Sequence, residues 1–254
     1  MQPIWTQELF LRSCNCDMQG RWKPSDILVA MQEAAGAHSE IFGMGTRETH
    51  ERGIFWVVSR VALEFDAYPM MGQTVRLATW PGVANRLMCP RYFTFETEDG
   101  RSLGRASTLW MLLDLDKHTL APVSRLGRDF PDTAGLGEAL PLPGRIRTPD
   151  EPCASATRQA VLSDCDINRH VNNTRYADWV CDRLPLARFE HECLRRLHIN
   201  YQTEVLPTTN VVLDLYEDGD AFTLIGHGEE GKPTYFEAEG AFMPWAGTPI
   251  TPER

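Results

Sequence analysis

The 254-residue sequence predicts an α+β fold made of two similar halves, each with an antiparallel sheet curled around one buried helix. Three observations lead to this prediction. The same order of elements occurs twice, each half combines one helical pattern with several alternating strand patterns, and a connector rich in Pro and Gly separates the halves. A hydrophobic content of 43% is enough to bury a core on this plan.

The repeat rests on two local alignments. Residues 16–21 (Cys-Asp-Met-Gln-Gly-Arg) align with 165–170 (Cys-Asp-Ile-Asn-Arg-His) at an offset of 149, and residues 60–65 align with 196–201 at an offset of 136. The two offsets differ by 13 residues, which predicts a shorter connection between helix and strand in the second half.

One helix is expected in each half. The first begins at Pro24, which with Ser25 and Asp26 forms a typical start, and ends at Gly43. The second follows Asn172 and Asn173 and stops at Pro185, with apolar residues every four positions at Tyr176, Val180 and Leu184.

Alternating apolar residues predict strands around 61–65, 75–77, 197–201 and 211–215, with hairpin turns at 98–100 and 230–231. Residues 226–231 match the spacing GxGxxG, but a strand pattern resumes directly after them. A dinucleotide site needs a helix there, so we interpret the motif as a hairpin.

The predicted domains are an N-terminal domain over 1–130, a linker over 131–155 and a C-terminal domain over 156–254. The linker assignment follows from five prolines and three glycines without apolar periodicity between residues 131 and 152.

Composition excludes several classes of protein. A net charge of −10 disfavours nucleic acid as a partner, and apolar runs of at most five residues are far below the roughly 18 that span a bilayer. Seven cysteines and no recognisable targeting segment predict a cytoplasmic protein with reduced thiols. No metal-binding or cofactor motif is present, so we expect neither a bound metal ion nor a cofactor. A homodimer is compatible with the sequence.

One segment carries candidate chemistry. Asp166, Asn168 and His170 lie at i, i+2 and i+4, and on an extended chain they would point to one side, next to the free amides of the following helix. This layout suits attack on a carbonyl. Alternatively, the polar residues form Asx turns and caps and His170 is a surface histidine; spacing alone favours this second interpretation.

Residues 163–176 (SDCDINRHVNNTRY) resemble the signature D-x-N-x-H-V-N-N-x-x-Y of the plant and bacterial acyl-ACP thioesterases. Residues 17–35 and 56–60 are also similar to that family. The resemblance implies two tandem hotdog folds and hydrolysis of fatty acyl-ACP to free fatty acid and acyl carrier protein. It further implies catalytic roles for Asp166, Asn168, His170 and Glu204.

Glu204 presents a difficulty, because strand alternation places it on the face opposite Leu197, Ile199 and Tyr201. It reaches the site only if the strand ends or bulges there. Some relatives carry a cysteine after this glutamate, but Val205 stands here, so a thiol nucleophile at this point is excluded. We expect Asp166 or Glu204 to polarise water together with His170. Substrate-binding residues are expected at Asn172 and Asn173.

In the first half, Arg21 and Tyr68 stand where His170 and Glu204 stand in the second. We therefore expect the first half to bind the acyl chain in a tunnel along its helix. Ala34 and Ala35, with Ala30 and Ala37, would leave space, and Met31 or Ile41 would block it. The alternative is that the alanines only permit close packing.

An acidic carrier protein requires a basic patch around the tunnel mouth, for which the candidates are Arg183, Arg188, Arg195 and Arg196. Two other functions stay open. The same site could hydrolyse acyl-CoA, or the chain could be a non-catalytic hotdog module that binds lipid.

Overall fold

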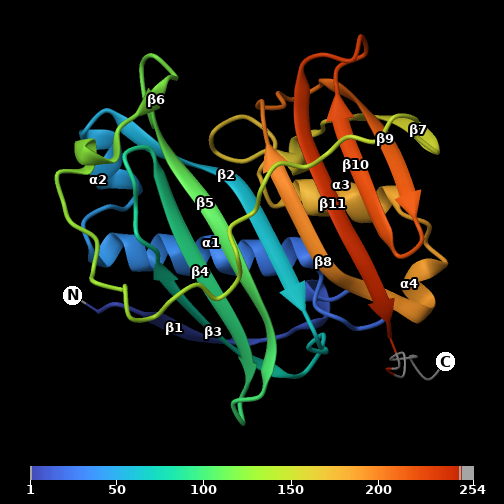
Figure 1. Cartoon of the computed structure of the whole chain (residues 1–254), viewed down its shortest axis with the longest axis horizontal. Coiled ribbons are helices and arrows are strands. Elements are labelled where there is room, and N and C mark those ends of the chain that lie inside the picture. Colours follow the sequence, from blue (N-terminus) through green and yellow to red (C-terminus); the bar gives the residue numbers. More distant parts are fainter. Residues whose placement is uncertain (1, 246, 248–254) are drawn as a thin grey trace.

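A computed structural model describes residues 2–245 and 247. This part of the chain forms one antiparallel sheet of 11 strands, with helices α1 (Pro24–Ile41) and α3 (Arg175–Arg183) on the same face (Figure 1). Most buried apolar side chains of both halves form one hydrophobic cluster between this face and the helices, and a smaller separate cluster lies in the first half, around Phe42 and Leu112. The α+β prediction is confirmed.

The two halves have the same strand order. In the first half the order is β1-β3-β4-β5-β2, with the short β6 beside β5, and in the second it is β7-β9-β10-β11-β8. The first-half strands are β1 (Trp5–Phe10), β2 (Ile54–Phe65), β3 (Thr74–Pro81), β4 (Met88–Thr97), β5 (Ser102–Asp114) and β6 (Leu120–Ala121). The second-half strands are β7 (Ala154–Gln159), β8 (Glu192–Tyr201), β9 (Asn210–Asp218), β10 (Ala221–His227) and β11 (Thr234–Pro244). Short helices α2 (Thr46–Glu51) and α4 (Arg188–His191) precede β2 and β8.

Strands β2 and β8 join the two halves by antiparallel pairing, in which Ala62 lies opposite His198. These two residues are also equivalent in the repeat, since 136 positions separate them. The local two-fold relationship between the halves therefore passes through this pair.

Helix α1 begins at Pro24 and ends just before Gly43, whose φ of 67° is in the left-handed region that favours glycine. Both boundaries agree with the prediction. Helix α3 has nine residues against 18 in α1, so the helix itself is shorter in the second half. The sequence predicts that the 13-residue difference between the halves lies in the connection between helix and strand, and this prediction was wrong for most of these residues. The last turns of α1, residues 35–41, have no counterpart in α3.

Between Leu126 and Ala154 the described chain contains no helix or strand. This segment crosses the face of the sheet that lies opposite the helices (Figure 1). Its carbonyl groups accept hydrogen bonds from strand side chains, including Trp80 Nε1 to Gly137 O at 3.1 Å and Arg60 Nη1 to Pro143 O at 3.0 Å. The connector is therefore fixed to the sheet, while the domain boundaries remain a prediction.

The GxGxxG spacing falls in the hairpin between β10 and β11, so the decision against a dinucleotide site agrees with the fold. Within residues 2–245 and 247, no helix has the length and apolar character needed to cross a bilayer.

Candidate active site

A cavity of about 620 Å³ lies where the two halves meet and brings the predicted catalytic segment together with the first half. The second half contributes the loop 166–173, Tyr176 and the segment 201–204, and the first half contributes α1, α2, β2 and the end of β5. This volume lies within the usual range for small-molecule sites. Asp166, Asn168, His170 and Glu204 all line the cavity.

The segment 166–170 is a tight turn, so the expectation of an extended chain was wrong. Cys165 and Val171 pair across its base, and Arg169 has a φ of 65°. Its counterpart in the first half is Gly20, with a φ of 80°. Because a left-handed residue is needed here, side chains at i, i+2 and i+4 do not alternate as they would in a strand.

The carboxylate of Asp166 holds this turn together. One oxygen accepts the backbone N–H of Asn168 at 2.8 Å, and the other accepts Asn172 Nδ2 at 2.9 Å. Both oxygens of Asp166 therefore already accept hydrogen bonds. This arrangement is more typical of a residue that positions the loop than of a residue that takes a proton from water.

Asn172 forms a turn directly before α3, whose N-cap residue is Thr174. Its side-chain oxygen accepts the amide of Thr174 at 2.9 Å, and its backbone oxygen accepts the amide of Arg175 at 2.9 Å. The expectation of free amides at the helix start was wrong for these two groups. The carboxamide of Asn172 is bonded at both ends, so the side chains of Asn168 and Asn173 are the better candidates for contacting substrate.

The contacts of His170 define its tautomer. Nδ1 lies 3.2 Å from the carbonyl oxygen of Val171, which can only accept, so Nδ1 carries the proton in the neutral ring. Nε2 is then the basic nitrogen, and it lies 3.9 Å from a carboxylate oxygen of Glu204. This distance is too long for a direct hydrogen bond, but a water molecule about 2.8 Å from each atom would contact both.

Glu204 reaches the cavity because β8 ends at Tyr201. The chain then leaves the sheet and is tied to the loop 166–173 by the hydrogen bond from Val171 N to Val205 O at 2.9 Å. Strand alternation stops at Tyr201, and this satisfies the condition on which the assignment of Glu204 depended.

Tyr201 fixes the other side of the loop. Its hydroxyl donates to the backbone oxygen of Asn173 at 2.9 Å. Burial raises the pKa of Tyr201 well above its ordinary range, so this hydroxyl stays protonated and remains a donor. Strand alternation predicts a core-facing position for Tyr201 but not this contact, because nothing near Tyr201 in the sequence indicates which loop faces the end of β8.

The equivalent loop of the first half has a different role. Asp17 accepts the backbone amides of Gln19 and Arg21, each at 2.9 Å, whereas Asp166 accepts only the first of the two equivalent amides, that of Asn168. Arg21 is buried and bonds to Asp17 at 2.8 Å, to Phe189 O at 2.9 Å and to Glu192 O at 2.6 Å. The loop 17–21, which has Arg21 in place of the histidine, thus connects the first half to the second through hydrogen bonds.

Only some of the predicted tunnel residues line a cavity. Ala35 lines the large cavity, and Met31 lines a small void of about 10 Å³ next to it. Ala34 is fully buried and lines neither of the two, which agrees with the close-packing alternative for this residue. Ile41 is 49% exposed, so the expectation that it blocks a tunnel was wrong.

The proposed basic patch does not surround the cavity, since none of its four arginines lines the walls. Arg188 pairs with Glu192 at 2.6 Å, and Arg195 lies 3.8 Å from Asp66. Arg195 and Arg196 lie in the middle of β8, whereas the cavity lies at its end.

Within the described part of the chain, no three His, Cys, Asp or Glu side chains are placed together as ligands of an ion.

Comparison with known proteins places the chain in a family. Residues 3–126 match the sequence model of the acyl-ACP thioesterase N-terminal domain, and residues 154–228 match that of the C-terminal domain. The chain belongs to the acyl-ACP thioesterase family. The resemblance noted in residues 163–176 is thereby confirmed.

Solved structures agree with this family assignment. An acyl-ACP thioesterase from Bacteroides thetaiotaomicron has a TM-score of 0.88 and 25% identity, over 95% of this chain and 98% of that one. A 12:0-ACP thioesterase from Umbellularia californica has a TM-score of 0.84 and covers 96% of this chain and 99% of that one; at 20% identity, it supports the fold alone. The predicted tandem hotdog architecture is confirmed.

A palmitoyl-acyl carrier protein thioesterase from Arabidopsis thaliana chloroplasts is 25% identical over 214 residues, which are 79% of this chain and 52% of that protein. The present chain therefore spans about half the length of the curated relatives it matches.

Proposed function

We propose that this chain hydrolyses the thioester of a fatty acyl group on acyl carrier protein, releasing free fatty acid and the carrier thiol. The observation that carries the proposal is the pair His170 and Glu204, 3.9 Å apart on the wall of a cavity of about 620 Å³. Membership in the acyl-ACP thioesterase family supports the choice of substrate.

The geometry suggests a sequence of steps. Nε2 of His170 takes a proton from a water that also contacts Glu204, and the resulting hydroxide adds to the thioester carbonyl carbon. The carboxamides of Asn168 and Asn173 donate to the carbonyl oxygen as negative charge develops on it. The carbon–sulfur bond then breaks, and the proton passes from His170 to the departing thiolate.

Glu204 lowers the barrier in this scheme by orienting the water and by stabilising the imidazolium that forms. Asp166 acts as a positioning residue, because both of its oxygens hold the turn that carries Asn168 and His170. The acyl chain extends into the first half, along the wall formed by the last turns of α1.

Acyl-CoA is the second candidate substrate, because the same groups would cleave it and only the carrier differs. We propose the cytoplasm as the location, since all seven cysteines are unpaired, as is typical of a reducing compartment.

The test is to incubate the protein with acyl-ACP and acyl-CoA of matched chain lengths and to measure free fatty acid. We expect a higher kcat/KM for acyl-ACP. A preference for acyl-CoA would support the second candidate. Absence of hydrolysis with both, while the protein binds fatty acid, would support a non-catalytic lipid-binding module.

A further inference from the structure

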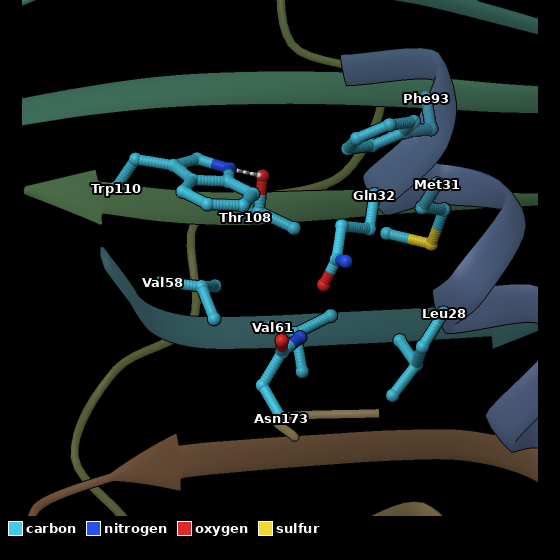
Figure 2. Close-up of a pocket in the computed structure, with 9 residues that line it drawn as sticks. All are labelled: Leu28, Met31, Gln32, Val58, Val61, Phe93, Thr108, Trp110 and Asn173. Carbon is cyan, nitrogen blue, oxygen red and sulfur yellow. Dashed lines mark hydrogen bonds between the residues drawn. The ribbon is translucent and has the colours of Figure 1, made fainter. Parts of the chain in front are cut away.

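Two cavities lie on either side of a partition made of four side chains. Gln32, Val58, Trp110 and Asn173 line both the large cavity and the small void of about 10 Å³. The void lies between α1 and the sheet, and Figure 2 shows Gln32 near the centre of the side chains that line it.

Beyond the partition the void is apolar. Leu28, Met31, Val61 and Phe93 line it, and all four are at most 3% exposed. Thr108 is the one further lining residue, and its hydroxyl is already bonded to Trp110 Nε1 at 2.8 Å. A void of this size holds at most about one water molecule, so in this structure it is too small for an acyl chain.

Two side chains of the partition are fixed, and a third residue is held by its backbone. The indole of Trp110 is held by the bond to Thr108, drawn as a dashed line in Figure 2. Val58 is a stiff β-branched residue in β2, and the backbone of Asn173 accepts the hydroxyl of Tyr201.

Gln32 differs from Val58 and Trp110. Among the residues that the structure describes, its carboxamide makes no hydrogen bond, and the same is true of Asn173; the Gln32 side chain is the longer of the two and points from α1 toward Asn173 (Figure 2). The long Gln32 side chain has rotatable bonds that Val58 and Trp110 lack, so it can leave the partition at the lowest cost. Its polar end also opposes the passage of a hydrocarbon chain, because burial there would leave the carboxamide without a hydrogen bond.

We propose that Gln32 determines acyl-chain specificity by closing the route from the catalytic cavity into the apolar interface between α1 and the sheet. This inference rests on the proposed thioester hydrolysis. In the wild-type protein, the chain end stays in the large cavity, beside Ala35, Gly36 and Ser39. Removing the Gln32 side chain joins the two spaces, and the flexible Met31 then limits the depth.

The experiment measures kcat/KM for saturated acyl-ACP substrates of increasing length. For Gln32→Ala, the ratio of the chain about two carbons longer than the wild-type optimum to that optimum should rise about tenfold, the equivalent of two buried methylenes. Gln32→Ser should give the same shift in this ratio. It replaces Gln32→Ala in the experiment if the alanine variant shows no cooperative unfolding transition and is therefore not folded. Glu33→Ala, on the exposed side of α1, is the matched control.

Met31→Ala separates the entrance from the depth. Alone it enlarges a space that Gln32 still closes, so the ratio should stay within about twofold of wild type, whereas combined with Gln32→Ala it should rise beyond the single variant. The inference is overturned if Gln32→Ala and Gln32→Ser hydrolyse substrate with an unchanged ratio, or if Met31→Ala alone shifts it as much. If wild-type protein hydrolyses no acyl thioester, the proposed function itself is rejected.

Discussion

Arg21 and His170 occupy equivalent positions in the two halves, yet Arg21 is buried in contact with the second half, whereas His170 lines the cavity. Their loops share one geometry, in which an aspartate four residues earlier accepts backbone amides. The side chain that follows this turn therefore decides whether the loop becomes a joint between halves or part of a reactive site.

Arg21→Met should lower the free energy of unfolding by about 3 kcal/mol, because it leaves one carboxylate oxygen of Asp17 and two backbone carbonyls without their donor. Urea denaturation measures the change. Arg195→Met, which removes an exposed pair with Asp66 at 3.8 Å, is the control and should cost less than about 1 kcal/mol. Equal effects of the two variants would contradict the joint assigned to Arg21.

His170→Ala should lower kcat/KM by about 10²-fold or more, because the general base is lost. Glu204→Gln should cost about tenfold, and the double variant should be no worse than His170→Ala, because both groups act on one water. Release of free fatty acid is the readout, and exposed His191→Ala is the control. Retention of more than about a tenth of wild-type activity by both single variants would exclude these roles.

Asp166→Ala should reduce kcat less than His170→Ala does, because its carboxylate positions the turn and does not face the basic nitrogen. Asp166→Asn keeps an oxygen that accepts from Asn168 N, so it should recover part of the lost kcat. Steady-state kinetics with saturating substrate compare the variants. If Asp166→Asn is as inactive as His170→Ala, the charge of Asp166 itself takes part in the reaction.

Ala34→Leu and Ala35→Leu form a matched pair on neighbouring positions of α1. Ala35→Leu narrows the cavity and should shift the preference toward shorter acyl chains, whereas Ala34→Leu overpacks the core and should cost about 1–3 kcal/mol of stability. Product chain lengths and thermal unfolding distinguish the two. An unchanged acyl preference in Ala35→Leu would argue against an acyl chain beside α1.

The pair Asp214 and His227 predicts a pH dependence of stability. Burial of His227 acts to lower its pKa, but its contacts with Gly228 O at 2.7 Å and Asp214 at 2.9 Å raise the pKa above 6.5. Burial of Asp214 acts to raise its pKa, but hydrogen bonds with Ser155 and His227 hold the pKa below 3.8. Both groups are therefore charged together over a range that includes pH 3.8 to 6.5.

The contribution of His227 is complete below pH 6.5 and is lost as the pH rises through its raised pKa; that of Asp214 is present above pH 3.8 and is lost as the pH falls through its lowered pKa. His227→Gln should therefore reduce stability most between these values, by about 1 kcal/mol, and less at high pH. Urea unfolding of both proteins across pH measures this. A difference that does not vary with pH would contradict the charged pair.

Local patterns predicted much of the fold. Pro24 and Gly43 defined the ends of α1 because the first fits a helix start and the second adopts a left-handed φ. The alignment of 60–65 with 196–201 predicted that β2 and β8 are equivalent strands, because such strands carry the same alternation; their pairing with each other was not predicted.

The turn at 166–170 was predicted incorrectly, although a signal was present. Gly20 stands at the position equivalent to Arg169, and a glycine there indicates a left-handed residue. The prediction for Arg195 and Arg196 was wrong for another reason: position along β8 does not reveal which end of the strand borders a cavity.

The sequence by itself determined the duplicated helix-in-sheet plan and the polar residues of the second half, because capping, alternation and the family signature depend on neighbouring residues. Only the tertiary structure decided that Glu204 meets His170 and that Gln32 stands between two cavities. Those relationships join segments far apart in the chain, and they depend on where β8 ends and on how α1 packs against the sheet.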